Sequence, residues 1–210
     1  LNKLAHEYIT SQNAVPSFLG YSGYPASICV SIDCEVVHGI PSKHKVLAEG
    51  QIVSYDVGAI FNGWNGDAAR TVAVGIISPE VQQLVDVTEQ CFFKGVECIK
   101  PGVTRLGDLG HTIQSHAESF GYGVVRELVG HGIGREMHED PNVPNFGIPG
   151  HGMRLSVGMT IAIEPMITMG TEKVDWMSDG WTVKTKDRKP AAHYENTIAI
   201  TDNGVEILSL

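Results

Sequence analysis

The stretch Ile52-Val53-Ser54-Tyr55-Asp56-Val57 leads into Asn62-Gly63, the strongest signal for a tight β-hairpin in this chain. A two-residue loop at this turn places Asp56 opposite Ala69 on the returning strand. Asp67 then points to the same face as Asp56, as a diagonal neighbour about 7–8 Å away at Cα. The hairpin therefore predicts that the two carboxylates share one site.

Two further acids lie in similarly apolar segments. Glu164 lies in the run from Thr160 to Pro165, and Glu195 precedes the apolar residues that end at Ile200. An ionised acid buried in such a run costs several kcal/mol unless a positive group compensates it. Taken one at a time, each acid could also be a solvent-facing strand residue, and Asp67 could be an ordinary turn residue.

Two histidines lie in a glycine-rich segment that we expect to be a loop. His131 stands between Gly130 and Gly132, which would let the backbone approach another group closely, and His138 follows seven residues later. A single histidine is more often a hydrogen-bonded structural residue. This segment alone leaves metal or catalytic roles and a structural role equally open.

The acids and the first histidine make sense together as the ligands of two metal ions. Four carboxylates carry a charge of −4, which two divalent cations would balance. Mn²⁺, Fe²⁺, Co²⁺ and Zn²⁺ all accept oxygen ligands together with one imidazole. A water shared between two such ions ionises near neutral pH and becomes a nucleophile. The pattern predicts a two-metal hydrolase whose metal ligands are Asp56, Asp67, His131, Glu164 and Glu195.

The spacing of apolar residues and turn signals predicts an α+β fold in one catalytic domain over 1–210. We expect helices over 1–13, 79–99 and 104–120, and a long loop over 141–152. We expect strands over 28–33, 51–60, 67–74, 123–128, 160–168, 193–200 and 205–208. The order of these elements suggests two similar halves.

The composition of the chain argues against several classes of function. The formal charge of −9 disfavours a nucleic-acid binder, and no apolar run reaches the length of a membrane span. The four cysteines show neither CxxC spacing nor the density of a disulfide scaffold, which favours a reducing, cytoplasmic setting. The chain starts at Leu1 inside a helical pattern and without a methionine, so we expect a preceding segment. A monomer is the plainer expectation.

Several motifs together resemble the type I methionine aminopeptidases of bacteria. They cover nearly the whole chain and comprise Leu19-Gly20-Tyr21, Gly23-Tyr24-Pro25, Val37-His38-Gly39-Ile40-Pro41, Tyr55-Asp56, Asn65-Gly66-Asp67, Gly130-His131-Gly132-Ile133-Gly134, Ile163-Glu164-Pro165, Asp179-Gly180-Trp181-Thr182, Lys186-Asp187-Arg188 and Tyr194-Glu195-Asn196-Thr197. The resemblance implies the pseudo-two-fold "pita-bread" fold, a curved antiparallel sheet covered by helices.

The resemblance also implies roles for the candidate residues. Asp56 and Asp67 would hold one ion and His131 and Glu164 the other, with Asp67 and Glu195 bridging both. Glu164 would also move a proton. His138 would bind the substrate carbonyl, and His38 would lie near the scissile nitrogen. Without the resemblance, the interpretation of His38 would be an ordinary loop histidine.

A methionine side-chain pocket follows from the same resemblance. Its aromatic and sulfur-containing residues suit an unbranched thioether, and they are Phe18, Tyr21, Tyr24, Cys29, Met137 and Trp181. Some members of the family carry cysteine at the position of Phe18, histidine at Ser22 and phenylalanine at Met137. The shape of this pocket therefore departs from that of some relatives.

The implied activity is removal of the initiator methionine from N-terminal Met peptides and nascent chains with a small second residue, with docking at the ribosome. One alternative is an Xaa-Pro aminopeptidase or dipeptidase on the same fold. The chain is short, and its segment from Tyr21 to Cys29 disfavours that alternative. Another alternative is a non-catalytic binding module, which should have lost metal ligands, whereas all five are present.

Overall fold

The computed structural model describes residues 1–210 as three α-helices, a short 3-10 helix and fifteen strands. The helices are α1 (Asn2–Ser11), η1 (Tyr21–Gly23), α2 (Pro79–Cys98) and α3 (Leu106–Ser119). The strands are β1 (Val15–Pro16), β2 (Cys29–Ile32), β3 (Glu35–Val37), β4 (Ile52–Phe61), β5 (Trp64–Ala73), β6 (Gly123–Val124), β7 (Gly130–Gly132), β8 (Glu139–Val143), β9 (Thr160–Ile163), β10 (Met166–Thr168), β11 (Val174–Trp176), β12 (Val183–Thr185), β13 (Ala191–His193), β14 (Glu195–Thr201) and β15 (Gly204–Ile207).

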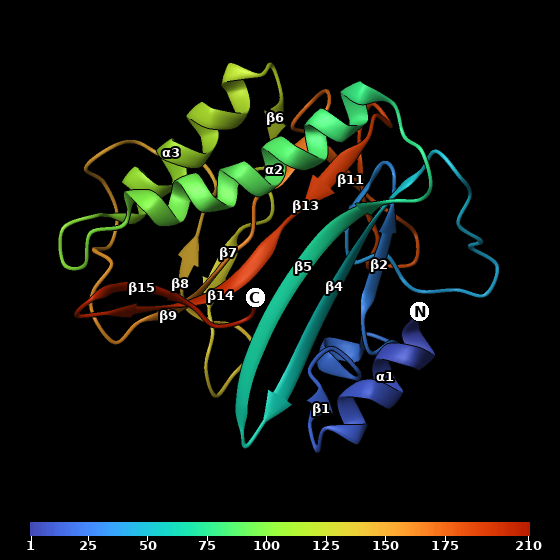
Figure 1. The fold of residues 1–210 in the computed structure, drawn as a ribbon, viewed down its shortest axis with the longest axis horizontal. Coiled ribbons are helices and arrows are strands. Elements are labelled where there is room, and N and C mark those ends of the chain that lie inside the picture. Colours follow the sequence, from blue (N-terminus) through green and yellow to red (C-terminus); the bar gives the residue numbers. More distant parts are fainter.

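A nine-stranded antiparallel sheet forms the centre of the molecule. Its main path runs β1-β4-β5-β14-β9-β7-β8, while β2 pairs with β4 and β15 pairs with β14. Two three-stranded sheets, β13-β10-β6 and β11-β12-β3, complete the fold. Figure 1 shows the long β4–β5 hairpin running away from α2 and α3, with α1 beside its far end. Helices and antiparallel strands thus form the predicted α+β architecture.

The β4–β5 hairpin has the predicted register. Asp56 lies opposite Ala69 and Asp67 lies opposite Gly58. The turn residues Asn62 and Gly63 have φ angles of 51° and 78°, as a two-residue hairpin turn requires. The prediction that both aspartates lie on one face of the hairpin is confirmed.

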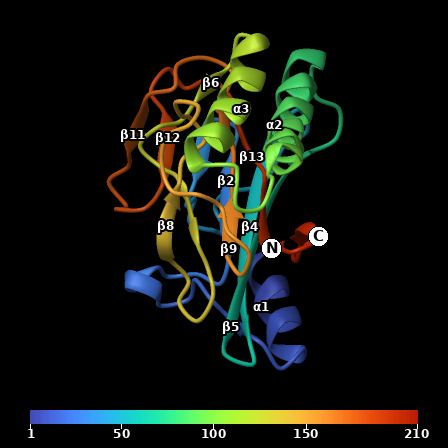
Figure 2. The same ribbon diagram turned by 90° about the vertical axis from the view of Figure 1, so that its left-hand side faces the viewer.

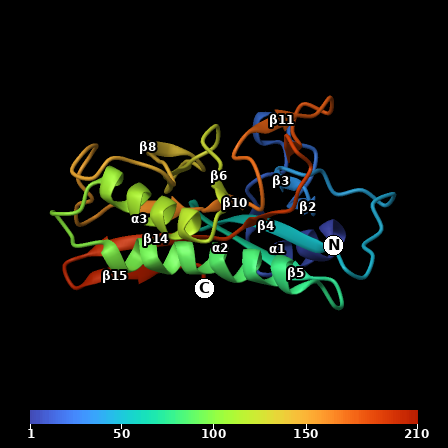
Figure 3. The same cartoon turned by 90° about the horizontal axis from the view of Figure 1, so that it is seen from above.

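Helices α2 and α3 lie side by side and cover one side of the sheet (Figures 2 and 3). The Ser78 side chain accepts a hydrogen bond from the backbone N–H of Val81, and Pro79 occupies the first turn of α2. Leu84 and Phe92 from α2 and Ile113 from α3 are fully buried in the main apolar core. None of the helices has the length and apolar character needed to cross a bilayer.

Strands of the second half alternate between this core and the opposite face. Ile198 and Ile200 of β14 belong to the apolar core under the helices, whereas the Thr197 hydroxyl, on the other face, bonds to the Asp67 backbone. Because side chains alternate along a strand, Glu195 lies on the same face as Thr197. Since β5 pairs with β14 through Ala69 and Glu195, acids from both halves of the chain meet there.

Several predicted elements differ from the structure. The strand predicted over 160–168 is two strands, β9 and β10, because Glu164-Pro165 interrupts it and proline has no N–H to donate. The strand over 193–200 is likewise divided at Tyr194, and the strand over 123–128 is only Gly123–Val124.

The glycine-rich stretch around His131 and part of the loop predicted over 141–152 are also strands. Gly130–Gly132 forms β7, and the predicted loop begins inside β8. Both strands are short and pair with each other, and β7 also pairs with β9, so local sequence patterns did not reveal them. The helix predicted over 1–13 is α1, Asn2–Ser11, and Ile9 is its only buried residue.

Gly130 should be required for β7 to pair closely with its neighbour. A Cβ atom at Gly130 would lie 2.4 Å from the Ala162 carbonyl oxygen, whereas a Cβ at Gly66 meets nothing within 4 Å. We expect Gly130→Ala to lower the free energy of unfolding by about 1–3 kcal/mol. Gly66→Ala should leave it nearly unchanged. Urea unfolding followed by circular dichroism measures both, and equal midpoints would contradict the prediction.

Candidate metal centre

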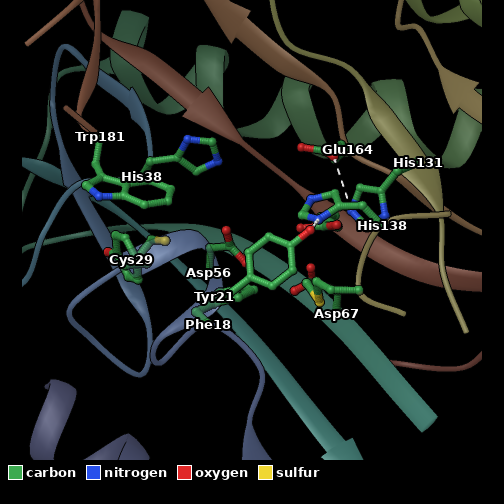
Figure 4. A pocket seen from close by; sticks show the side chains of 13 residues that line it. Phe18, Tyr21, Cys29, His38, Asp56, Asp67, His131, His138, Glu164 and Trp181 are labelled. Atoms are coloured by element: carbon green, nitrogen blue, oxygen red, sulfur yellow. Dashed lines mark hydrogen bonds and ion pairs between the residues drawn. The ribbon is translucent and has the colours of Figure 1, made fainter. Parts of the chain in front are cut away.

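One cavity brings together all thirteen residues that the sequence singled out (Figure 4). Its lining comprises Phe18, Tyr21, Tyr24, Cys29, His38, Asp56, Asp67, His131, Met137, His138, Glu164, Trp181 and Glu195. No other residue lines it. The cavity therefore joins the predicted metal ligands, the two predicted substrate histidines and the predicted side-chain pocket.

Five different segments supply the five candidate ligands. Asp56 comes from β4, Asp67 from β5, His131 from β7 and Glu195 from β14, and Glu164 follows directly after β9. Each side chain is buried or nearly so, and that of Glu164 is 13% exposed. The sheet thus concentrates four acids in a space that water hardly reaches.

Burial and mutual repulsion oppose the ionisation of these acids. Burial, together with the nearby charge of Glu164, raises the pKa of Asp67 to about 7. Burial also raises the pKa of Glu164 to about 7, against an opposing effect of His131. The pKa values of Asp56 and Glu195 lie well above the usual range, first through burial and then through repulsion by Asp67. Four ionised carboxylates here require positive charge beside them.

The donor atoms fit divalent cations. Asp56 Oδ1 and Glu195 Oε1 are buried without any hydrogen-bond partner, which is costly unless a cation satisfies them. Ligand atoms of Asp67, His131 and Glu195 all lie within 4.8 Å of one another. His131 Nδ1 lies 2.8 Å from the Gly132 carbonyl oxygen, which leaves Nε2 free to face the acids. Such a mixture of oxygens and one imidazole suits borderline divalent metals.

Neighbouring groups hold the backbone of the candidate ligands. The Asp67 N–H donates to the Thr197 hydroxyl at 2.9 Å. Arg70 Nη1 donates to the Glu195 carbonyl oxygen at 2.6 Å, and Asn145 Nδ2 donates to the Glu164 carbonyl oxygen at 2.9 Å. Hydrogen bonds of this kind orient metal ligands and are part of a metal site's design.

The two other histidines lie on different sides of the acids (Figure 4). The His138 ring lies 4.2 Å from the His131 ring, and His138 Nδ1 lies 2.7 Å from the Tyr21 hydroxyl. His38 lies beside Trp181, with 6.4 Å between ring centroids. Burial lowers the pKa of His38 to about 4, so its ring is neutral at pH 7. Both imidazoles can therefore hydrogen-bond a group placed over the acids.

An apolar pocket adjoins the acids. Phe18, Tyr24, Cys29 and Met137 form one buried cluster against which Trp181 packs. Tyr24 and Trp181 meet edge to face at 5.0 Å, and aromatic rings in this geometry attract each other. The Tyr24 hydroxyl donates to the Gly39 carbonyl oxygen at 3.0 Å, which leaves no polar group of Tyr24 unpaired. The pocket suits a flexible apolar side chain of moderate length.

His193 lies against the candidate ligands although no motif in the sequence predicted it. Its side chain is 2% exposed, and its Nε2 atom lies 3.4 Å from Glu164 Oε2 and 3.9 Å from Glu195 Oε2. One signal was available, because His193 precedes Glu195 by two residues and alternate residues of a strand share a face. The break at Tyr194 weakens that signal.

The comparison with family models identifies the class of protein. Residues 1–202 match the model of metallopeptidase family M24. A match over nearly the whole chain, with a buried site of acids and histidines, shows that the chain belongs to this family of metallopeptidases.

Individual relatives narrow this class further. The chain is 61% identical over 210 residues to a methionine aminopeptidase of Clostridium acetobutylicum, covering 100% of this chain and 84% of that relative. It is 48% identical over 209 residues to methionine aminopeptidase 1 of Bacillus subtilis, with the same two coverages. Within the family, the chain thus belongs with the bacterial methionine aminopeptidases, as its motifs predicted.

Solved structures agree on the fold. The methionine aminopeptidase of Thermotoga maritima superposes with a TM-score of 0.97 at 50% identity, over 99% of this chain and 83% of that chain. A prolidase of Pyrococcus furiosus superposes with a TM-score of 0.70 at 26% identity, over 87% of this chain and 48% of that chain. The predicted pita-bread fold is confirmed.

Chelator-treated protein should become less stable as the pH rises from about 7 to 8.5. In the unfolded chain the acids are already ionised in this range, whereas folded Asp67 and Glu164 still hold protons near pH 7. A raised folded-state pKa gives stability that is present at low pH and lost as the pH passes through that pKa. Histidines contribute little here, because above pH 7 they are mostly neutral in both states.

Thermal unfolding in chelator at several pH values measures this effect. The melting temperature should fall across the range, and the fall should be smaller in Asp67→Asn and smaller again with saturating Mn²⁺. A melting temperature that rises with pH in chelator would contradict the electrostatic account of the site.

Proposed function

We propose that this protein removes the N-terminal methionine from peptides and nascent proteins whose second residue is small. The single observation that carries the proposal is the cavity that holds five candidate metal ligands beside an apolar pocket. Its support comes from relatives named methionine aminopeptidases, of which one is 61% identical over the whole chain. The reaction is hydrolysis of the first peptide bond.

The proposal assigns the five ligands to two divalent ions. Asp56 and Asp67 would hold one ion, His131 and Glu164 would hold the other, and Asp67 and Glu195 would contribute to both. Two divalent ions held there would supply a bound water that ionises near neutral pH. The unpartnered buried oxygens of Asp56 and Glu195 support this assignment, and Co, Mn, Fe and Zn all suit the donor set.

The remaining polar groups act on the substrate. Glu164, whose carboxylate lies beside the other candidate ligands and is 13% exposed, accepts a proton from water and passes it to the leaving amine. His138 donates a hydrogen bond to the scissile carbonyl oxygen, where negative charge develops. His38, neutral at pH 7, contacts the scissile nitrogen from the opposite side of the cavity. These roles use groups that already face one another (Figure 4).

Specificity for methionine comes from the apolar pocket. Cys29 and Met137 supply soft, polarizable contacts, and the aromatic rings of Phe18, Tyr21, Tyr24 and Trp181 form walls around a thioether. The buried cluster around Tyr24 supports this assignment. Residues 1–210 form the single catalytic domain of this proposal. The location is cytoplasmic, and the protein acts as a monomer that meets nascent chains at the ribosome.

The alternative activity is cleavage next to proline. The prolidase of Pyrococcus furiosus shares the fold at 26% identity, against 50% for the methionine aminopeptidase of Thermotoga maritima. A non-catalytic module is the other alternative, and retention of every candidate ligand in one cavity argues against it.

Metal removal and return should switch methionine release off and on. After treatment with chelator, the protein should release no methionine from a Met-Ala-Ser peptide, and Co²⁺ or Mn²⁺ should restore release. Asp67→Ala and His131→Ala each remove a ligand, so their activity should stay at least 100-fold lower at every metal concentration. Quantifying free methionine by mass spectrometry measures the release.

A parallel assay with Xaa-Pro peptides separates the alternatives. Faster cleavage of an Xaa-Pro peptide than of Met-Ala-Ser would favour the prolidase activity. If the folded protein binds metal but cleaves neither peptide with Co²⁺, Mn²⁺, Fe²⁺ or Zn²⁺, the non-catalytic module would be favoured.

His138 should matter for turnover more than for binding. Removal of one hydrogen-bond donor to a developing oxyanion lowers kcat by about 100–1,000-fold, so we expect His138→Ala to lower kcat on this scale while KM changes little. His44 is exposed in a loop outside the cavity, and His44→Ala serves as the matched control with unchanged kcat. Steady-state kinetics with Met-Ala-Ser measures both, and equal kcat in the two variants would remove His138 from the proposed mechanism.

A further inference from the structure

A buried histidine lies directly behind the metal ligands without lining their cavity. His193 ends strand β13, and its side chain is 2% exposed. Its Nε2 atom is buried and has no hydrogen-bond partner in good geometry, which is unfavourable unless a partner becomes available. A buried ring nitrogen that points toward a carboxylate cluster is in a position to interact with one of those carboxylates.

We propose that His193 is a positioning residue that donates a hydrogen bond from Nε2 to the Glu164 carboxylate and so holds Glu164 in place for metal binding and proton transfer. This inference rests on the proposed function, because it takes Glu164 as a metal ligand and proton carrier. His193 itself touches neither substrate nor metal in this assignment.

Each oxygen of the Glu164 carboxylate lies near a different imidazole. Glu164 Oε1 lies 3.8 Å from His131 Nε2, whereas Oε2 lies 3.4 Å from His193 Nε2. A neutral imidazole has one N–H, and on Nε2 this proton points to a carboxylate. Hydrogen bonds to catalytic groups are often long in the absence of ligands and shorten when the site is assembled. One oxygen of Glu164 thus remains for the metal while the other is held.

The backbone of His193 is fixed on both sides. Its N–H donates to the Thr71 hydroxyl at 2.9 Å, and that hydroxyl donates to the His193 carbonyl oxygen at 2.9 Å. On the other edge, β13 pairs with β10, with His193 opposite Met166. The imidazole therefore extends from a rigid point of the fold.

The backbone around Glu164 is fixed as well. Asn145 Nδ2 donates to the Glu164 carbonyl oxygen at 2.9 Å, and the Tyr194 N–H donates to the Pro165 carbonyl oxygen at 3.2 Å. Because both backbones are held, the relative position of the imidazole and the carboxylate depends on few free torsions. Such outer groups typically change metal affinity or activity by about 10–100-fold when mutated.

A direct ligand role is the competing interpretation of the same residue. Ligand atoms of Asp56, His193 and Glu195 lie within 4.8 Å of one another. However, His193 Nε2 lies closer to Glu164 Oε2 than to Glu195 Oε2, at 3.4 Å against 3.9 Å. The shorter approach favours donation to Glu164 over metal coordination.

Three substitutions test the positioning role. The side-chain nitrogen of His193→Gln can reach the position of Nε2 and donate from there. The nitrogen of His193→Asn lies nearer the backbone, at the position of Nδ1, and His193→Leu has no donor. Calorimetric titration of the chelator-treated full chain with Co²⁺, the visible spectrum of the Co²⁺ protein, and kinetics with Met-Ala-Ser are measured for each variant.

We expect His193→Gln to keep the Co²⁺ affinity and kcat within about 3-fold of the parent chain and to leave the Co²⁺ spectrum unchanged. His193→Asn and His193→Leu should bind Co²⁺ about 10–100-fold more weakly and lower kcat to a similar extent with little change in KM. If His193→Leu fails to fold, the comparison of His193→Gln with His193→Asn decides, because both carry the same amide. Circular dichroism establishes folding.

Two results would overturn the proposal. Parent-like Co²⁺ affinity in His193→Asn and His193→Leu would show that His193 does not position Glu164. A Co²⁺ spectrum that changes as strongly in His193→Gln as in His193→Asn would indicate that Nε2 of His193 coordinates the metal directly. The metal-binding measurements are independent of methionine release, so a failure of the proposed peptidase activity remains distinguishable from a failure of this inference.

Discussion

The cost of gathering four buried carboxylates governs this structure. Burial and mutual repulsion raise the pKa values of Asp56, Asp67, Glu164 and Glu195, so the site is complete only when positive charge joins it. The half-buried His38 and the deeply buried His193 supply no such charge, because burial lowers their pKa values to about 4 and about 3. Metal binding is therefore directly coupled to the electrostatic cost of burying these four acids.

The central sheet holds the candidate ligands at fixed positions. The candidate ligands come from separate strands whose side chains alternate between the helix-covered core and the cavity, so the same strands that bury Ile198 and Ile200 present Glu195. Glycines on β7 allow the strand that carries His131 to approach its neighbours closely. Bonds from Thr197, Arg70 and Asn145 to ligand backbones limit movement. Rigidity of this kind keeps like charges near one another at a definite spacing.

Chemistry and recognition are divided between the ends of one cavity. The acids and His131 lie at one side, with His138 beside His131, and the apolar cluster around Tyr24 lies at the other, where His38 lies beside Trp181. This division explains why the protein can combine a general hydrolytic site with selection of a single side chain. In the proposed function, the polar part acts on the backbone that every peptide shares, whereas the apolar part contacts only the first residue.

The sequence by itself determined the β4–β5 register, the two long helices and the candidate ligands. A two-residue loop at Asn62-Gly63 allows only one register between the two flanking strands. An ionisable acid in an apolar run has few structural uses. Only the tertiary structure decided the short strands β7 and β8, the break at Glu164-Pro165 and the place of His193. Their partners lie far away in the sequence, so their conformations follow from long-range pairing, which no local pattern encodes.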